Sequence, residues 1–367
     1  MASQSILKYH IASFVLLVTT SVAAAQISPL RDTVKKEELN FFCEGYFAGS
    51  TTEARNKQED FYYNHQKLNS PGINFTSIQY HFEKKRWGLD VGIQDGRYVQ
   101  ANYSTQPLIN RLISQANIHY LPFQRHDISL QAGIFPSHIG FESAWNTDNL
   151  TLTRSMLAEN SPYYESGISL SWNGPDQKWG LKALCLSGWQ QSQWKWPVQH
   201  PSFGWATYWH PCTDWKLAYN GFHGNLDNLT AFPYSYHNIY MQAKWKSYEC
   251  IMGYDIGIKY KINRWHSPVI IVAKKWNQKL RSAIRWEKMM DPQSTILTDN
   301  LTPWKNRMAY SANVDWIIHS LFTARIEYKF AKANDGIFIK HHDLITFNCI
   351  FHCSSKKQAI HFVLSDY

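Results

Sequence analysis

The sequence predicts an all-β fold, a transmembrane antiparallel β-barrel of about sixteen strands around an open aqueous lumen. Two observations predict it. Segments of about ten residues recur in which apolar and polar side chains alternate, for example from Trp87 to Gln94, and this is the pattern of a strand with one buried face. The connections between these segments are alternately short and long along most of the chain, as in barrels whose turns and loops lie on opposite sides of a membrane.

The alternation places the expected strands at 41–52, 72–83, 86–95, 112–122, 127–135, 165–173, 178–189, 203–210, 215–224, 237–246, 249–262, 268–276, 280–290, 306–318, 321–332 and 343–353. The long connections are 53–71, 96–111, 136–164, 190–202, 225–236 and 291–304. A closed barrel satisfies every backbone group of a sheet in lipid, and sixteen strands leave room for a lumen. Tryptophans near strand ends suit the aromatic girdles at the two membrane interfaces: Trp87, Trp172, Trp179, Trp245, Trp286 and Trp316.

The two ends of the 367-residue chain fall outside the expected barrel. Lys8, the apolar run 11–19 and the small residues 23–25 indicate a secretory signal peptide over residues 1–25. Residues 26–40 are a polar lead-in, residues 41–353 form the outer-membrane barrel and residues 354–367 are a C-terminal extension. The location that this organisation predicts is the bacterial outer membrane.

The composition argues against a helical membrane protein and against an enzyme. Aromatic residues make up 15% of the chain, the formal net charge is +9 and the mean hydropathy is −0.41, with no apolar run long enough for a spanning helix. The sequence has no G-x-S-x-G, H-E-x-x-H or glycine-rich phosphate loop. We expect no catalytic residue, no cofactor, no nucleic-acid partner and no metal; His341-His342 is a weak metal motif and more typical of a loop tip. Six cysteines have no C-x-x-C spacing, and a Cys185–Cys212 disulfide stays open.

The polar faces of the expected strands carry the side chains that would line the lumen. They are Arg86, Asp90, Gln131, Lys182, Lys244, Lys246, Lys259, Arg281, Arg285, Glu287, Arg325 and Glu327. With Arg307, Lys329, Asp255 and Asp315 included, basic residues outnumber acidic ones by about two to one, and rings of Lys and Arg favour anions. The alternative is that the charges pair, as Arg285 with Glu287 and Arg325 with Glu327, and leave little net field.

The connection 136–164 is too long and too rich in aromatic and charged residues for a plain surface loop. Loops of this length inside compact folds are usually functional, and in a barrel such a loop can fold inward and narrow the lumen. Its charged members are Glu142, Asp148, Arg154 and Glu159. Two alternatives remain open, an outward surface loop and a loop that binds a partner.

Several motifs of this region and of a later strand resemble one protein family. They are Gly140-Phe141-Glu142, Asn149, Thr153-Arg154-Ser155, Pro162-Tyr163, Gly167, Gly188-Trp189 and, in the later strand, Arg285-Trp286-Glu287. In this order they resemble the OmpL-like β-barrel porin family of Gram-negative bacteria, over roughly Phe41 to His352. The chain departs from the family at its end, where Cys353 takes the place of an aromatic residue and fourteen residues follow.

The resemblance implies an outer-membrane porin, a barrel that passes small hydrophilic solutes by diffusion and performs no reaction. Its partners would be outer-membrane lipid and small hydrophilic solutes or ions. The charge count adds a weak anion preference. One alternative is an adhesin or binding barrel with a plugged lumen, which would give no stepwise conductance. The other is a barrel hydrolase, which would need a Ser/His/carboxylate group at one rim.

Overall fold

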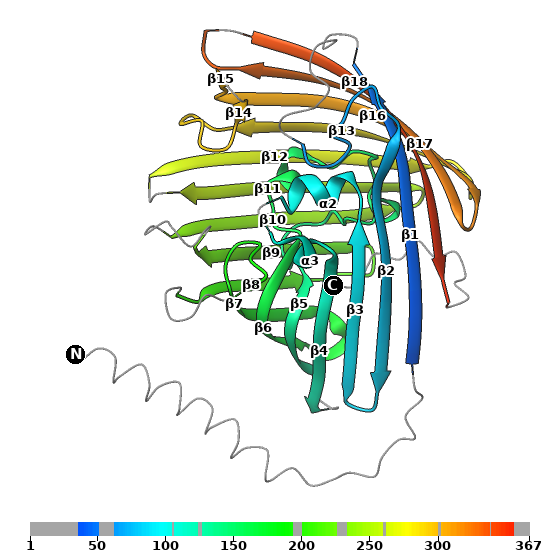
Figure 1. The fold of residues 1–367 in the computed structure, drawn as a ribbon, viewed down its shortest axis with the longest axis vertical. Helices are drawn as coiled ribbons and strands as arrows, with labels where there is room; N and C mark the ends of the chain where they lie inside the picture. The colour runs from blue at the N-terminus through cyan, green and yellow to red at the C-terminus, as the bar shows by residue number, and fades with distance from the viewer. Residues whose placement is uncertain are drawn as a thin grey trace. The chain divides into compact units, whose positions relative to one another are not determined.

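The computed structural model describes residues 36–50, 62–104, 106–123, 127–193, 200–225, 233–259, 262–299, 302–337 and 339–355. The expected signal peptide and all but the first two residues of the expected C-terminal extension lie outside these residues. The described strands form a closed antiparallel barrel of sixteen strands in the order β1-β18-β17-β16-β13-β12-β11-β10-β9-β8-β7-β6-β5-β4-β3-β2 (Figure 1). The predicted fold class and strand number are therefore confirmed.

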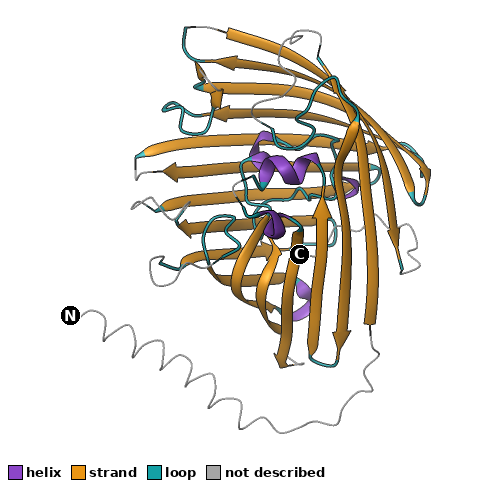
Figure 2. Ribbon diagram, viewed as in Figure 1, coloured by secondary structure: helices purple, strands orange, loops and turns teal. Residues whose placement is uncertain are grey.

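The barrel strands are β1 (Lys36–Gly49), β2 (Gly72–Lys84), β3 (Trp87–Asp95), β4 (Ile113–Phe123), β5 (Ile128–Pro136), β6 (Tyr164–Asn173), β7 (Trp179–Leu186), β8 (Ser202–Trp209), β9 (Trp215–Gly224), β10 (Tyr234–Trp245), β11 (Tyr248–Lys259), β12 (Asn263–Lys275), β13 (Leu280–Met290), β16 (Asn306–His319), β17 (Phe322–Asn334) and β18 (Ile339–Ser354). A small hairpin lies in the connection after β13, and each of its strands, β14 (Thr298–Asp299) and β15 (Thr302–Pro303), has two residues. The helices in the described part of the chain are short, with three to six residues each (Figure 2): α2 (Arg97–Asn102), α3 (Leu108–Arg111), α4 (Met156–Glu159), η2 (Asn146–Asp148) and η3 (Pro175–Gln177).

The first strand begins earlier than the sequence predicts. Residues 36–40, expected to belong to the lead-in, pair with β2 from Lys36 opposite Glu83 to Asn40 opposite Gln79. Charged and polar residues dominate this end of β1, so the alternation that marks a strand is weak there. The same strand closes the barrel against β18, with Asn40 opposite Ser354 and Gly49 opposite Ile345.

The two faces of the barrel wall differ in chemistry. Along β17, Ile326 and Tyr328 are exposed on the outside, whereas Arg325, Glu327 and Lys329 are buried on the inside. An apolar outer band is what the hydrocarbon of a bilayer requires. Along β3, Leu89 and Val91 point outward in the same way. The alternating pattern in the sequence thus gave the correct facing for these strands.

Aromatic side chains gather on the outside where the strands meet the short turns. Trp179 stacks on Trp209 with ring centroids 5.2 Å apart, and Trp87 packs on Tyr120 at 4.3 Å. Trp172, Trp245 and Trp316 are likewise exposed on the strands. Of the tryptophans expected in girdles, only Trp286 lies elsewhere, several residues along β13 from its short turn. Such a ring of amphipathic aromatics marks one membrane–water interface.

Two further findings concern helices and cysteines. No helix in the described part of the chain has the length and apolar character needed to cross a membrane. All six cysteines are free thiols, so the Cys185–Cys212 disulfide that the sequence left open is not formed.

Candidate functional site: the interior loop and the wall that holds it

The connection between β5 and β6, residues 137–163, crosses the interior of the barrel. In the ring of sixteen strands β13 lies eight strands from β5 in either direction, which is the opposite wall. Side chains of β13, β16 and β17 nevertheless hydrogen-bond to residues of this connection, and they do so from their buried faces. The connection is called the interior loop below.

Arg285 of β13 and Glu327 of β17 hold Thr153 of the interior loop between them. The guanidinium donates from Nη1 to the Thr153 carbonyl oxygen at 2.5 Å and from Nη2 to its Oγ1 at 2.9 Å. The Glu327 carboxylate accepts from the Thr153 backbone N–H and hydroxyl, each at 2.7 Å. Arg285 also pairs with Glu327 at 3.0 Å. Charge-assisted hydrogen bonds of this kind are stronger than neutral ones, so Thr153 is a firm anchor.

A second anchor lies nearer the short turns of the same strands. Asp315 of β16 pairs with both Arg281 and Arg325, at 2.5 and 2.7 Å. Arg281 donates to the Asn149 carbonyl oxygen at 2.8 Å. Arg325 donates to the Asn146 carbonyl oxygen at 2.6 Å and to its side-chain oxygen at 2.7 Å. The arginines therefore use part of their donors on the wall and the rest on loop carbonyls.

Short-range interactions shape the loop between these anchors. The Ser155 hydroxyl caps helix α4 by accepting from the Ala158 N–H at 3.2 Å. The Glu142 carboxylate accepts from the Ser155 N–H at 2.9 Å and from its hydroxyl at 2.7 Å. The free N–H of Met156, at the first turn of α4, donates to Glu287 of β13 at 2.6 Å. Serine is a preferred N-cap because its oxygen satisfies an orphan N–H, and Glu287 satisfies another from the wall.

Glu44 of β1 has partners from four other parts of the chain. Its carboxylate is 1% exposed and accepts from Asn74 of β2 at 2.8 Å and from Asn146 of the interior loop at 2.8 Å. His65, in the connection after β1, lies 2.9 Å from it, and Asn348 of β18 also donates to it. A buried carboxylate is tolerated only with such partners, so Glu44 ties the interior loop and the first long connection to the wall.

Aromatic side chains fill the space beside the loop. One cluster joins Phe42 and Phe75 of the wall to Tyr98 of α2, with Trp145 and Tyr163 of the loop packed against it. Phe42 and Trp145 stack at 5.4 Å, and Tyr98 and Tyr163 lie 4.7 Å apart. The interior at this level is therefore much narrower than the circumference of sixteen strands alone would leave.

The four charged loop residues have different surroundings. Arg154 is buried and lies 4.0 Å from the centroid of the Tyr163 ring; burial lowers its pKa, but Tyr163, Tyr98, Glu159 and Glu142 together raise it. Burial raises the pKa of Glu159, and Arg154 opposes that shift. Glu159 also accepts from the Tyr63 N–H at 2.7 Å. Asp148 is the one member of the four with an exposed side chain, but the protein that surrounds it still displaces much of its hydration, and this desolvation raises its pKa to about 6.

Five of the expected lumen-lining residues face the interior but are covered by the loop. They are Arg281, Arg285, Glu287, Arg325 and Glu327, each no more than 8% exposed. They hold the loop and do not line an open passage, which corrects the sequence-based expectation. The cause is that a long loop brings its own carbonyls, hydroxyls and N–H groups to the charged wall, and desolvated charges require such partners.

Four other expected residues also face the interior. Asp90 lies 2.6 Å from His81 Nδ1 and 3.5 Å from His119 Nδ1, with partly exposed side chains, and Gln131 donates to Asn117 at 2.9 Å. The Lys182 ammonium lies 5.3 Å from the centroid of the Phe135 ring. Lys244, near the short-turn end of β10, alternates with the outward Trp245.

The last three expected residues lie at strand ends. Lys246 is in the tight turn after β10 and lies over the Trp245 ring on the outside, so it does not line the lumen. Arg86 is in the turn before β3 and donates toward the Pro122 carbonyl oxygen at 3.5 Å. Lys259 is the last residue of β11. β10 ends one residue before the expected boundary, β3 begins one residue after it and β11 ends three residues before it, and boundaries are the weakest part of a sequence pattern.

The sequence interpretation missed the residues that receive the arginines and Glu44. These are Asn74, Asn146, Thr151 and Asn348, all buried. The sequence does not single them out, because an Asn or Thr is common both on the polar face of a strand and in a loop. Glu44 had a better signal, since it is a lone carboxylate within the apolar run FFCEGYF. In the described part of the chain no group of three or more His, Cys, Asp or Glu is arranged to hold a metal ion.

Comparison with known proteins agrees with this geometry. Residues 38–354 match the protein family described as "Putative beta-barrel porin-2, OmpL-like". The chain belongs to this family. The match covers the barrel from β1 to β18 except for the first two residues of β1, which places the porin in the outer membrane. No curated protein sequence matches the porin significantly.

Solved porin structures share the fold at low sequence identity. The outer-membrane channel DcaP of Acinetobacter baumannii is 10% identical, with a TM-score of 0.59 over 87% of this chain and 97% of that chain. OmpF of Salmonella typhi, solved in complex with daunomycin, is 10% identical, with a TM-score of 0.60 over 88% of this chain and 100% of that chain. OprB of Pseudomonas putida is 9% identical, with a TM-score of 0.58 over 87% and 94%. At such identities the likeness shows the fold alone.

Proposed function

We propose that the porin passes small hydrophilic solutes by passive diffusion and that the interior loop sets the narrowest part of the passage. The observation that carries this proposal is the attachment of Thr153 and Asn146 to strands on the wall opposite the loop's origin. A segment fixed at both ends of a diameter reduces the free cross-section and limits the size of the solute. No catalytic role is assigned to any residue of the chain.

We also propose a weak anion preference, with a different origin from the one the charge count indicated. The acids and arginines behind the loop pair with one another at 2.5–3.4 Å and contribute little net field. Lys182 and Lys244 face the interior on β7 and β10, which carry none of the charged side chains that hold Thr153, Asn146 and Asn149. Charges beside a narrow passage act through a low-dielectric wall and dominate selectivity.

Planar-bilayer recording tests both parts. Stepwise conductance is expected, and its absence would favour a plugged barrel. In a salt gradient the reversal potential should indicate a modest excess of anion permeability. Replacing Lys182 and Lys244 together with Gln should remove that excess, whereas Lys246→Gln, in the short turn after β10 and outside the lumen, is the matched control and should leave it unchanged. Cation preference in the unmodified porin would contradict the second part.

A further inference from the structure

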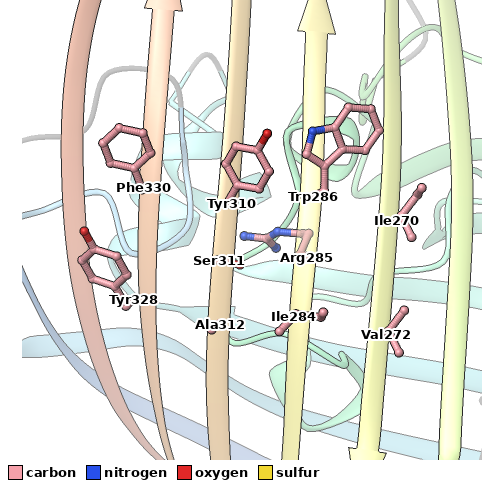
Figure 3. Close-up of a pocket in the computed structure, with 10 residues that line it drawn as sticks. All are labelled: Ile270, Val272, Ile284, Arg285, Trp286, Tyr310, Ser311, Ala312, Tyr328 and Phe330. Atoms are coloured by element: carbon pink, nitrogen blue, oxygen red, sulfur yellow. The ribbon is translucent and has the colours of Figure 1, made fainter.

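The outer face of the barrel has an apolar groove over four neighbouring strands. It lies on β12, β13, β16 and β17 and has a volume of about 440 Å³ (Figure 3). Its lining includes Ile284, Trp286, Tyr310, Ala312, Tyr328 and Phe330. These residues point to lipid. Arg285 and Ser311, which alternate with them along β13 and β16, also border the groove, but the Arg285 side chain is buried on the inner face of the wall. The apolar outward side chains of the groove are therefore distinct from the side chains that hold the interior loop.

The register explains why a groove forms here. Trp286, Tyr310 and Phe330 are cross-strand partners and form one row of rings. Ile284, Ala312 and Tyr328 form the next row in the same way. Ala312 is thus a small residue surrounded by large ones. Its short side chain leaves a recess between them, and Ala312 forms the floor of the groove. Figure 3 shows this arrangement, with the three rings in a row and Ala312 below them.

Two outward lysines stand at one end of the groove. Lys288 of β13 and Lys332 of β17 are both cross-strand partners of Met308, in the row beyond the rings. They are two strand spacings apart, roughly 9–10 Å, so both flexible side chains can reach one point above Met308. Neither lysine forms an ion pair with another residue of the described part of the chain. Uncompensated basic side chains beside an apolar groove are complementary to an anionic head group on an acyl chain.

Two outward residues of β18, His341 and Asp343, lie beside the lysine end of the groove. His341 is the partner of Lys332, and its ring stacks on Phe330 at 5.8 Å. Asp343, the partner of Phe330, is an outward carboxylate one row deeper and on the far side of β17 from Lys288. The basic character is therefore strongest between Lys288 and Lys332. At the same end of β3 the outermost outward residue is Asp95, so this end of the barrel is not basic on every strand.

The lysines lie at the end of the barrel that carries the long connections. β13 begins after the short turn 277–279 and ends before the long connection 291–304, and Lys288 is two residues from that end. In outer-membrane barrels the long loops face outward. The lysines are therefore at head-group height in the outer leaflet, and the groove below them is at the depth of the acyl chains.

We propose that this groove is a binding site for a phosphorylated glycolipid of the outer leaflet, with an acyl chain over Ala312 and a phosphate between Lys288 and Lys332. Lipids of the inner leaflet have their head groups at the opposite end of the groove, where Lys288 and Lys332 cannot reach them. The site concerns the outer wall and goes beyond solute diffusion. The aromatic rings fix the chain laterally, and the two ammonium groups recognise the phosphate.

Native mass spectrometry of the detergent-solubilised porin tests the site. The probes are a hexa-acylated disaccharide bisphosphate, the same lipid without phosphates, and phosphatidylglycerol. The bisphosphate should bind one molecule per chain more tightly than either comparison lipid. Replacing Lys288 and Lys332 together with Gln should weaken the binding of the bisphosphate about thirtyfold, because each lysine near a membrane surface strengthens the binding of an anionic lipid about five- to sixfold. Ala312→Leu fills the floor and should weaken all acylated probes by about tenfold.

Two matched variants separate the site from general effects. Lys274→Gln removes an outward lysine at the short-turn end, where it lies over Trp276, and Val314→Leu enlarges an outward residue outside the groove; both should bind like the unmodified porin. All variants should keep their bilayer conductance, so a failure of this site does not bear on solute passage. Equal binding of the phosphate-free lipid or of phosphatidylglycerol, or equal loss in the matched variants, would overturn the proposal.

Discussion

Arg285 of β13 and Glu327 of β17 grip the same threonine, Thr153, from two strands that are separated by β16. Neither side chain is more than 2% exposed. The interior loop is therefore attached through a charge pair that is itself desolvated, and each partner uses the loop to satisfy some of its other hydrogen-bonding groups. Detaching the loop would leave both charges short of partners.

The first prediction concerns this anchor. Thr153→Val keeps the shape of the side chain but removes the hydroxyl that Arg285 and Glu327 share. A lost buried hydrogen bond to a charged group costs about 1.5–3 kcal/mol, so the loop should leave the wall part of the time. Single-channel recordings should show larger and noisier steps. Thr147→Val is the control, because that hydroxyl contacts only Asp148. Identical recordings for both variants would show that Thr153 does not hold the loop.

The second prediction concerns Glu44. Glu44→Gln presents an amide to the amides of Asn74 and Asn348, so donors face donors. Breaking a buried ionic cluster on one side costs about 3–5 kcal/mol, and the unfolding temperature of the barrel should fall clearly in a heat-modifiability gel. Glu37→Gln, an exposed residue on the same strand that accepts from Tyr80, should change it little. An unchanged midpoint for Glu44→Gln would mean that the cluster is not stabilising.

The third prediction tests the facing of β17. Ile326→Arg places a charge on the lipid side and should lower the free energy of unfolding by about 2–4 kcal/mol. Asn334→Arg, at the outer end of the same strand, should have little effect because an arginine there reaches water. Denaturant titrations in lipid vesicles compare the two. If the Asn334 variant were the less stable one, the assignment of this strand to the membrane would be wrong.

The fourth prediction is a pH dependence of selectivity. The pKa of Asp148 is raised to about 6, so the carboxylate is charged at neutral pH and becomes neutral as the pH falls below that value. Loss of a negative charge in the interior should increase the anion preference. Reversal potentials at pH 7.5 and pH 5 measure the change. Asp148→Asn removes this charge at both pH values, so the reversal potential of this variant should not shift between pH 7.5 and pH 5. A shift as large as that of the unmodified porin would mean that other groups cause the effect.

The strands and the unusual loop could be predicted from the sequence because both leave local signals. Period-2 alternation marks each strand, and the aromatic and charged content of residues 136–164 marks the loop. The partners of the arginines left no such signal. The alternative that charges pair within a strand named Arg325 with Glu327, its neighbour on the same face, but Arg325 pairs with Asp315 on β16 and donates to Asn146 of the loop. Those contacts join residues 10 and 179 positions away in sequence.

The interior was likewise beyond local patterns. An aromatic residue on a strand reads the same whether it meets lipid, water or another ring. Phe42 and Phe75 pack on Trp145 and Tyr98, which arrive from two separate connections. The narrowing of the passage follows from where those connections go, and alternation along single strands carries no information about that.

The cluster around Glu44 also has a consequence for the order in which the barrel forms. Asn348 donates to Glu44 across 304 positions of sequence, and it arrives only when the last strand pairs with the first. Until then the Glu44 carboxylate lacks one of its donors. Asn146 of the interior loop then donates to Glu44 without the support of β18. Contacts of such separation form late because the intervening chain must first be ordered. Pairing of β18 with β1 therefore closes the cylinder and at the same time supplies Asn348 to the cluster that holds the loop, so closure of the wall and attachment of the loop are coupled.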